Sequence, residues 1–453
     1  ISEDFLNQMV DRLIDLAKKS EKALGNETYD PEEHHALARK IAGQCMVLLK
    51  NDGGILPLAA GARVAVIGDF AETPRYQGAG SSAVNSIKVD TLLDCLAQSG
   101  LQCAGFAAGF DRQGRPDADK KAQAVALAQK ADTVLLCLGL DEIKESEGLD
   151  RVDMKLADNQ IELLQAVEQA NPNTVVVLNA GASLETPWLA HCRALVYGAL
   201  GGQAGAGAMV DVLTGKVNPG GKLAETWANA YEETPAKDNF AGAGRTVQYR
   251  EGLYVGYRYY QTAGVPVAFP FGYGLSYTSY AYSDLKVTAD SVTLTVTNTG
   301  ARDGAEIVQV YIAKPGAEIF RPAQELKAFA RVSLAAGESR TVTLPLDDKA
   351  FRYWNTRTNG WEIEGGRYEV RVGASSADIR LTANVDIRGT NAPDPYAGKA
   401  LPHYKSGSVQ NVPDAEWEAL LGHPIPQDKV KIDRNMTLGE LNHSRSPLGW
   451  LIW

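Results

Sequence analysis

Five carboxylates lie in one short segment of the sequence, directly after a run of apolar residues. The run spans residues 133–140 and has the composition of a buried strand. Because ligands of open α/β sheets bind at the carboxyl ends of the strands, we expect the segment 141–151, here called the acidic loop, to face a ligand. Crowded carboxylates raise the proton affinity of at least one of them, as a general acid requires. A solvated loop without chemistry is the alternative. The five carboxylates are Asp141, Glu142, Glu145, Glu147 and Asp150.

A second polar segment follows the first predicted strand, residues 63–68, and is expected at the same edge of the sheet. Arg75 offers a planar set of donors, Tyr76 an aromatic face, and Gln77 and Ser81 further hydrogen-bonding groups, with Ser82 beside them. This combination suits a carbohydrate and predicts these residues as substrate-binding. The alternative, that they only order their own loop, stays open.

The pattern between residues 63 and 215 alternates short apolar runs with amphipathic stretches. This alternation predicts an α/β fold, a mostly parallel sheet with helices on both faces. The strands are expected at 63–68, 133–140, 174–178 and 194–197, and the helices near 118–130, 158–170 and 204–214.

The first 57 residues show helical periodicity. Apolar residues at helical spacing predict a helix over 3–24 that Gly25 ends. A second helix is expected to begin after Asp30, with Pro31 at its first position, and to continue to Gly53 and Gly54.

After residue 270 the pattern changes to alternating runs of period two, separated by turn residues such as Asn359-Gly360. This pattern predicts an antiparallel β-sandwich. The Pro-rich end is expected to wrap back over the other domains. The predicted domains are 1–57, a helical segment; 58–270, the α/β domain; 271–390, the β-sandwich; and 391–453, the tail.

Three glycine-rich segments, at 77–82, 201–207 and 219–221, invite a nucleotide-binding interpretation. A dinucleotide-binding glycine motif must follow the first strand at once, and here Asp69-Phe70 follows Gly68 instead. The sequence contains neither a phosphate-binding Gly-Lys-Ser/Thr motif, nor a Gly-x-Ser-x-Gly motif, nor histidines at metal-ligand spacing. We therefore expect no cofactor and no metal.

Length and composition limit the number of domains, the possible partners and the compartment of the protein. The 453 residues suggest two to three domains, and the net charge of −10 argues against nucleic acid or an anionic membrane as a partner. No apolar run reaches membrane-spanning length. The five cysteines have neither disulfide-framework nor zinc spacing, so a reducing compartment fits best, with cytoplasmic and periplasmic locations both open. The chain opens at Ile1 without Met and ends on an apolar segment, so we expect a longer protein.

Several motifs together resemble the second half of glycoside hydrolase family 3, the β-glucosidase family. They lie at residues 35–42, 47–58, 64–68, 76–82, 147–151, 211–226 and 269–277. The resemblance covers nearly the whole chain. It implies a six-stranded α/β-sandwich domain followed by a fibronectin type III-like domain, which agrees with the pattern.

The resemblance also implies a retaining mechanism with two carboxylates. Its Glu-Gly-(x)-Asp-Arg motif carries over onto Glu147, the general acid/base, with Glu145 and Glu142 ranked behind because neither precedes the glycine. The family's nucleophile is an Asp of a preceding (β/α)₈ barrel, and this sequence has neither that motif nor the barrel. The helix at 3–24 resembles the barrel's last segment. We therefore expect the chain to be inactive without a barrel domain, in cis or as a separate chain.

The leading hypothesis is one half of a retaining exo-β-glycosidase, a β-glucosidase acting on a β-glucoside or oligosaccharide. A β-xylosidase or α-arabinofuranosidase of the same family is the first alternative, because the sugar pocket belongs to the barrel. A non-catalytic carbohydrate-binding or scaffold module is the alternative of another class. The sequence leaves a homodimer open.

Overall fold

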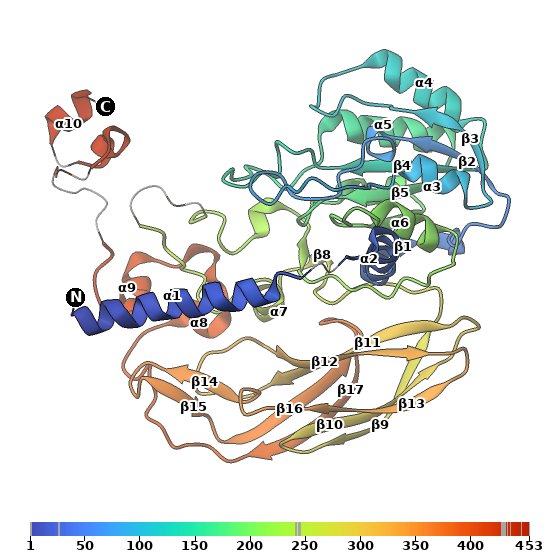
Figure 1. The fold of residues 1–453 in the computed structure, drawn as a ribbon. Helices are drawn as coiled ribbons and strands as arrows, with labels where there is room; N and C mark the ends of the chain where they lie inside the picture. The colour runs from blue at the N-terminus through green and yellow to red at the C-terminus, as the bar shows by residue number, and fades with distance from the viewer. Residues whose placement is uncertain are drawn as a thin grey trace.

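The computed structural model describes residues 2–25, 28–240, 242, 246–426, 432, 434, 436–444 and 446–452 (Figure 1). A six-stranded sheet in the order β1-β6-β5-β4-β2-β3 organises the first half. All neighbouring pairs are parallel except β1 with β6. The predicted α/β fold with a mostly parallel sheet is therefore confirmed. The strands are β1 (Val47–Asn51), β2 (Arg63–Ile67), β3 (Gln102–Ala107), β4 (Thr133–Gly139), β5 (Thr174–Asn179) and β6 (Ala194–Tyr197).

Helices cover both faces of this sheet, which buries its central strands. All seven residues of β4 are buried, because a parallel strand between two helical layers meets no water. On one side α4 packs with α5, and on the other α6 packs with α2 and α3 (Figure 1). These helices are α2 (Pro31–Cys45), α3 (Leu92–Ala97), α4 (Ala118–Ala128), α5 (Asp158–Ala170) and α6 (Gly205–Leu213).

The second helix is shorter than predicted. It ends at Cys45, and the segment expected to continue it forms β1, which pairs antiparallel with β6. Met46 to Leu49 are four consecutive residues, each at most 3% exposed. Such a run fits an edge strand that is covered on both faces. Hydrophobic periodicity alone does not distinguish a short buried strand from a buried helix. The edge strand β3 and the short α3 were not predicted, since β3 is partly exposed and lacks a continuous apolar run.

The helix α1 (Glu3–Ala23) is present as predicted, with Ser2 as its N-cap. None of its residues is buried, so its apolar face contacts solvent in this chain. No helix in the described part of the chain is long and apolar enough to span a membrane.

The second half is the predicted antiparallel β-sandwich. A three-stranded sheet, β13-β10-β9, faces a four-stranded sheet, β12-β11-β16-β17, around a separate apolar core. The strands are β9 (Tyr280–Val287), β10 (Ser291–Asn298), β11 (Gly304–Ala313), β12 (Glu325–Leu334), β13 (Ser339–Pro345), β16 (Gly366–Gly373) and β17 (Ile379–Ile387). Two further short pairs are β7 (Trp227–Ala228) with β8 (Val267–Phe269), and β14 (Arg352–Asn355) with β15 (Gly360–Ile363).

The tail carries α8 (Pro402–Ser406), α9 (Asp414–Leu421) and α10 (Pro447–Ile452). Tyr404 and Trp417 of the tail share a third apolar cluster with Tyr254, which lies just before α7 (Tyr257–Ala263), and with Phe320 of the sandwich. This part of the tail therefore packs against both of the other units.

One helix residue fixes the strand end from which the acidic loop departs. Gln160 of α5 is 2% exposed; its Oε1 accepts from the Gly139 N–H at 3.0 Å, and its Nε2 donates to the Gly139 carbonyl at 2.9 Å. We predict that Gln160→Leu lowers the free energy of unfolding by about 1–3 kcal/mol, because buried peptide groups lose their partners. Urea unfolding measures the loss. Gln165→Leu, at an exposed position of the same helix, should stay within about 0.5 kcal/mol of the parent chain. Equal effects of the two substitutions would contradict this role for Gln160.

Candidate active site

A groove of about 550 Å³ lies where the acidic loop meets the segment 75–82. Both segments follow strands of the parallel sheet, β4 and β2, whose neighbouring carboxyl ends bring them together. Gly181 and Ala182, just after β5, complete one wall. The groove is thus at the edge of the sheet where the sequence placed it.

Glu147 is exposed and lines the groove. Its Oε2 accepts two hydrogen bonds from Ser81, one from the backbone N–H at 2.7 Å and one from the hydroxyl. Its own N–H donates to the Ala79 carbonyl at 3.2 Å, so the two segments run side by side. Gly80 permits this approach: its φ is +95°, and a Cβ there would lie 2.7 Å from the Glu147 Cβ.

These contacts lower the proton affinity of the Glu147 carboxyl. The hydroxyl of Ser81 and then its backbone N–H stabilise the carboxylate and hold the pKa of Glu147 below its usual value. The sequence led us to expect a raised proton affinity for at least one of the five loop carboxylates, and in this chain Glu147 is shifted in the other direction. Hydrogen bonding to the charged form outweighs the opposing effect of lost hydration.

Three of the other four carboxylates of the acidic loop have partners of their own. The Asp141 carboxylate accepts the backbone N–H groups of residues 143 and 144, at 3.0 and 2.7 Å. Glu142 pairs with Arg112 at 3.0 Å. Glu145 pairs with Arg75 at 3.0 Å and also accepts the Gly181 N–H at 2.8 Å. Glu147 is thus the loop carboxylate that combines exposure to the groove with hydrogen bonds from the facing segment.

Arg75 and Gln77 make the contacts of residues that order their loops. The guanidinium of Arg75 is almost fully buried and donates to the carbonyls of Leu140, Asp141 and Glu145 at 2.8–2.9 Å, besides its ion pair. The Gln77 amide bonds to both backbone groups of Val84, at 3.0 and 3.1 Å. Of the two interpretations left open by the sequence, loop ordering describes these contacts. Contact of either residue with a substrate stays a prediction.

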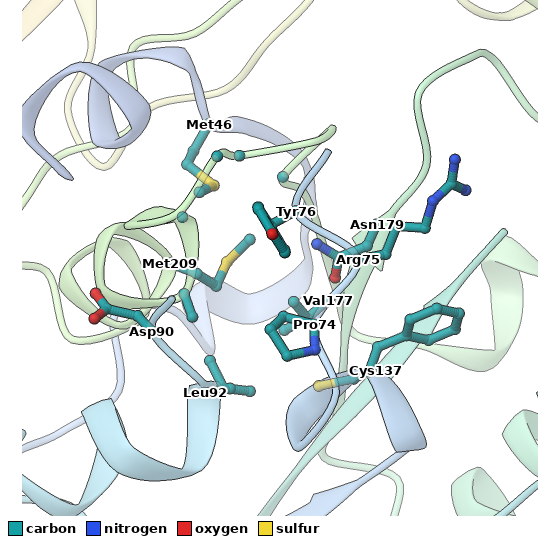
Figure 2. Close-up of a pocket in the computed structure, with 16 residues that line it drawn as sticks. Met46, Pro74, Arg75, Tyr76, Asp90, Leu92, Cys137, Val177, Asn179 and Met209 are labelled. Carbon is teal, nitrogen blue, oxygen red and sulfur yellow. The ribbon is translucent and has the colours of Figure 1, made fainter. Parts of the chain in front are cut away.

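Tyr76 lines a different space from Ser81. Figure 2 shows its ring among Met46, Met209 and Val177, in a small cavity of about 30 Å³. The backbone carbonyl of Tyr76 accepts the N–H of Gly202 at 2.9 Å. Ser81 lines the groove itself and contacts Glu147.

The groove also contains residues that the sequence did not single out. Lys144 and Arg151 line it, and Gly80 sets the approach of its two sides. Arg151 is the last residue of the motif 147–151, and that motif could have identified it as a site residue. Nothing in the sequence pattern distinguishes Gly80 from its neighbours. Within the described residues, no group of three or more His, Cys, Asp or Glu side chains could hold a metal ion.

Comparison with known proteins agrees with this architecture. Residues 46–277 match the Glycosyl hydrolase family 3 C-terminal domain, and residues 306–376 match a Fibronectin type III-like domain. The chain belongs to glycosyl hydrolase family 3. The family assignment drawn from the motifs is therefore confirmed.

Among curated relatives, an exo-α-(1→6)-L-arabinopyranosidase of Bifidobacterium breve is 42% identical over 408 residues, which are 86% of this chain and 54% of the relative. Thermostable β-glucosidase B of Acetivibrio thermocellus is 39% identical over 402 residues, 86% of this chain and 53% of the relative. The crystal structure of a family 3 β-glucosidase of Bifidobacterium adolescentis superposes with a TM-score of 0.82 at 39% identity, covering 100% of this chain and 62% of that one. The chain thus spans about half the length of the curated relatives.

The Ser81 hydroxyl is the first cause of the low proton affinity of Glu147. We predict that Ser81→Ala raises the pKa of Glu147 toward the value of about 4.3 usual for glutamate, because one donor to the carboxylate is lost. Carbon-13 NMR titration of the labelled carboxyl in this chain measures the pKa. Ser82→Ala is the matched control, because that hydroxyl lies beside Gly78 instead. A pKa of Glu147 that stays unchanged in Ser81→Ala would contradict the assignment.

Proposed function

We propose that this chain supplies the general acid/base, Glu147, of a retaining exo-β-glycosidase that releases terminal β-D-glucose. The observation that carries the proposal is the exposed Glu147 carboxyl in the groove, within hydrogen-bonding distance of Ser81. Membership of glycosyl hydrolase family 3 supports it.

In this mechanism the second carboxylate attacks the anomeric carbon while Glu147 protonates the departing glycosidic oxygen. Glu147 then removes a proton from the water that hydrolyses the glycosyl-enzyme. Retention requires the two carboxyl groups to lie about 5–5.5 Å apart, which leaves no room for water between them. The second carboxylate therefore has to come from a wall facing Glu147.

We assign that wall to a (β/α)₈ barrel domain, in cis or as a separate chain. Two surface features support a docked domain. Exposed apolar side chains lie on and after the two loops of the groove: Leu149, which lines it, is 60% exposed, Val152 is 86% exposed and Ile87 is 70% exposed. The apolar face of α1 is also uncovered, and Leu13 is 67% exposed. Uncovered apolar surface of this extent is typical of an interface.

A second domain over the groove would also raise the proton affinity of Glu147, which is low in the isolated chain. A general acid has to hold its proton near the working pH, and Ser81 acts against that in the open groove. A docked wall excludes water and adds a second carboxylate, and both effects raise the pKa of Glu147. The low proton affinity of Glu147 in this chain is therefore compatible with an acid role in the complete site.

The facing wall, which this chain does not provide, would determine which terminal sugar the enzyme accepts. The relatives named β-glucosidase favour a β-glucoside or oligosaccharide substrate, and the relatives named exo-α-(1→6)-L-arabinopyranosidase favour an arabinopyranoside as second candidate. β-Xylosidase and α-arabinofuranosidase activity are the further alternatives within the family. Aryl glycosides of these sugars, assayed side by side on the complete protein, distinguish them by kcat/KM.

We predict that the purified 453-residue chain does not turn over aryl β-glucosides, because it carries one of the two catalytic carboxylates. Addition of the barrel domain should restore turnover. Release of nitrophenol measures both. Steady turnover by the chain alone would contradict the proposed division of the site.

We predict that Glu147→Ala in the complete enzyme lowers kcat for unactivated glucosides by about 10²–10⁴-fold, the usual contribution of general acid/base catalysis. Substrates with dinitrophenolate leaving groups need no proton and should keep a fast first step. Azide should then restore turnover and give glucosyl azide, because it attacks without a general base. The control is Glu142→Ala, which removes a carboxyl of the same loop that pairs with Arg112. Unchanged kinetics in Glu147→Ala would favour the scaffold alternative.

A further inference from the structure

Arg151, at the end of the acidic loop, has unsatisfied donors beside the groove. Its Nη1 donates to the Ser183 carbonyl at 3.5 Å, a long hydrogen bond. Its Nε and Nη2 are buried and find no acceptor in the described part of the chain. Arg75, the other guanidinium lining the groove, has both of its Nη groups bonded to the acidic loop. A buried charged group with free donors is costly, so its retention calls for a compensating interaction.

That interaction is electrostatic, because Arg151 stands among carboxylates from several segments. Glu145, Asp153, Glu185 and Glu225 lie near enough for their charges to act on it. Two of these carboxylates also accept hydrogen bonds: Glu185 accepts the Tyr231 N–H at 2.9 Å, and Glu225 accepts the Ser183 hydroxyl at 3.3 Å. Four carboxyl groups therefore stand against two guanidinium groups, Arg75 and Arg151.

The surplus of negative charge already acts on one member of the cluster. Glu225 is exposed, yet partial loss of hydration raises its pKa, and the charge of Glu145 adds to the rise. Arg151 opposes this effect at Glu225. It thus acts as the cation that partly balances the cluster.

We propose that Arg151 is a positioning residue for the acid/base: it holds the end of the acidic loop against the segment after β5, and its charge adds to the hydrogen bonds from Ser81 in lowering the proton affinity of Glu147. The inference rests on the proposed function of Glu147. The groups that share the groove with Glu147 are Ser81 from the segment after β2, and Arg75, Lys144, Glu145 and Arg151. Arg75 leaves one buried donor unpaired in the described part of the chain, its Nε, whereas Arg151 leaves two, Nε and Nη2.

The sign of the effect follows from the charges. Loss of the Arg151 charge leaves the cluster more negative, which disfavours a further charge on Glu147 and keeps it protonated to higher pH. A general acid works only while it is protonated. Without the Arg151 charge, the alkaline fall of kcat/KM should therefore occur at a higher pH than in the parent enzyme. Loss of a carboxylate from the cluster should move that fall to lower pH.

The test is the pH profile of kcat/KM for an unactivated glucoside in the complete enzyme. Arg151→Gln should move the alkaline fall upward by up to about one pH unit, the effect of removing one charge from the shared groove. Arg151→Lys should leave the fall in place, since the charge remains, and lower kcat, since the planar guanidinium is lost. Glu225→Gln should move the fall downward. Arg115→Gln, at an arginine 74% exposed and paired with Asp111, is the matched control with an unchanged profile.

Folding of each variant is checked by thermal unfolding. If Arg151→Gln folds and its alkaline fall coincides with that of the parent enzyme, the inference is wrong; a merely structural role predicts that result, with a lower kcat alone. If Arg151→Gln does not fold, the Glu225→Gln profile decides, and an unchanged or upward shift overturns the proposal. Failure of the proposed function is seen separately, as retained kinetics in Glu147→Ala.

Discussion

The site depends on the close approach of two loops, joined by the hydrogen bonds from Ser81 to the Glu147 carboxylate. The loops meet because β2 and β4 are parallel neighbours and end at the same edge of the sheet. Gly80 allows the contact, since any Cβ at that position would collide with Glu147. Arg75 fixes the acidic loop by its hydrogen bonds to three backbone carbonyls and to the Glu145 carboxylate.

This arrangement favours the ionised form of Glu147 in the open groove. A general acid needs the opposite bias at the moment of bond cleavage, and exclusion of water by a second wall supplies it. The fold therefore holds the carboxyl in place, and the covering domain would complete its chemistry. The uncovered apolar residues around the groove and along α1 are consistent with such a division.

Much of the architecture could be predicted from the sequence, because buried parallel strands such as β4 are continuous apolar runs and sandwich strands alternate. The strand β1 could not, since a short run buried on all sides has no distinguishing period. Glu147 was predicted from its motif, whereas the sign of the shift in its pKa could not be predicted. That sign depends on Ser81, 66 residues away in sequence, and the sequence does not show which partner each loop carboxylate finds. The same reason explains why Tyr76 and Ser81, predicted together as sugar ligands, line different spaces.

The most direct measurement is the crystal structure of the complete enzyme with a bound, non-hydrolysable β-glucoside. The account predicts the Glu147 carboxyl within hydrogen-bonding distance, about 2.6–3.2 Å, of the glycosidic oxygen, and about 5–5.5 Å from a carboxylate of the facing wall. A glycosidic oxygen that lies out of reach of Glu147, with another carboxylic acid beside it, would contradict the account.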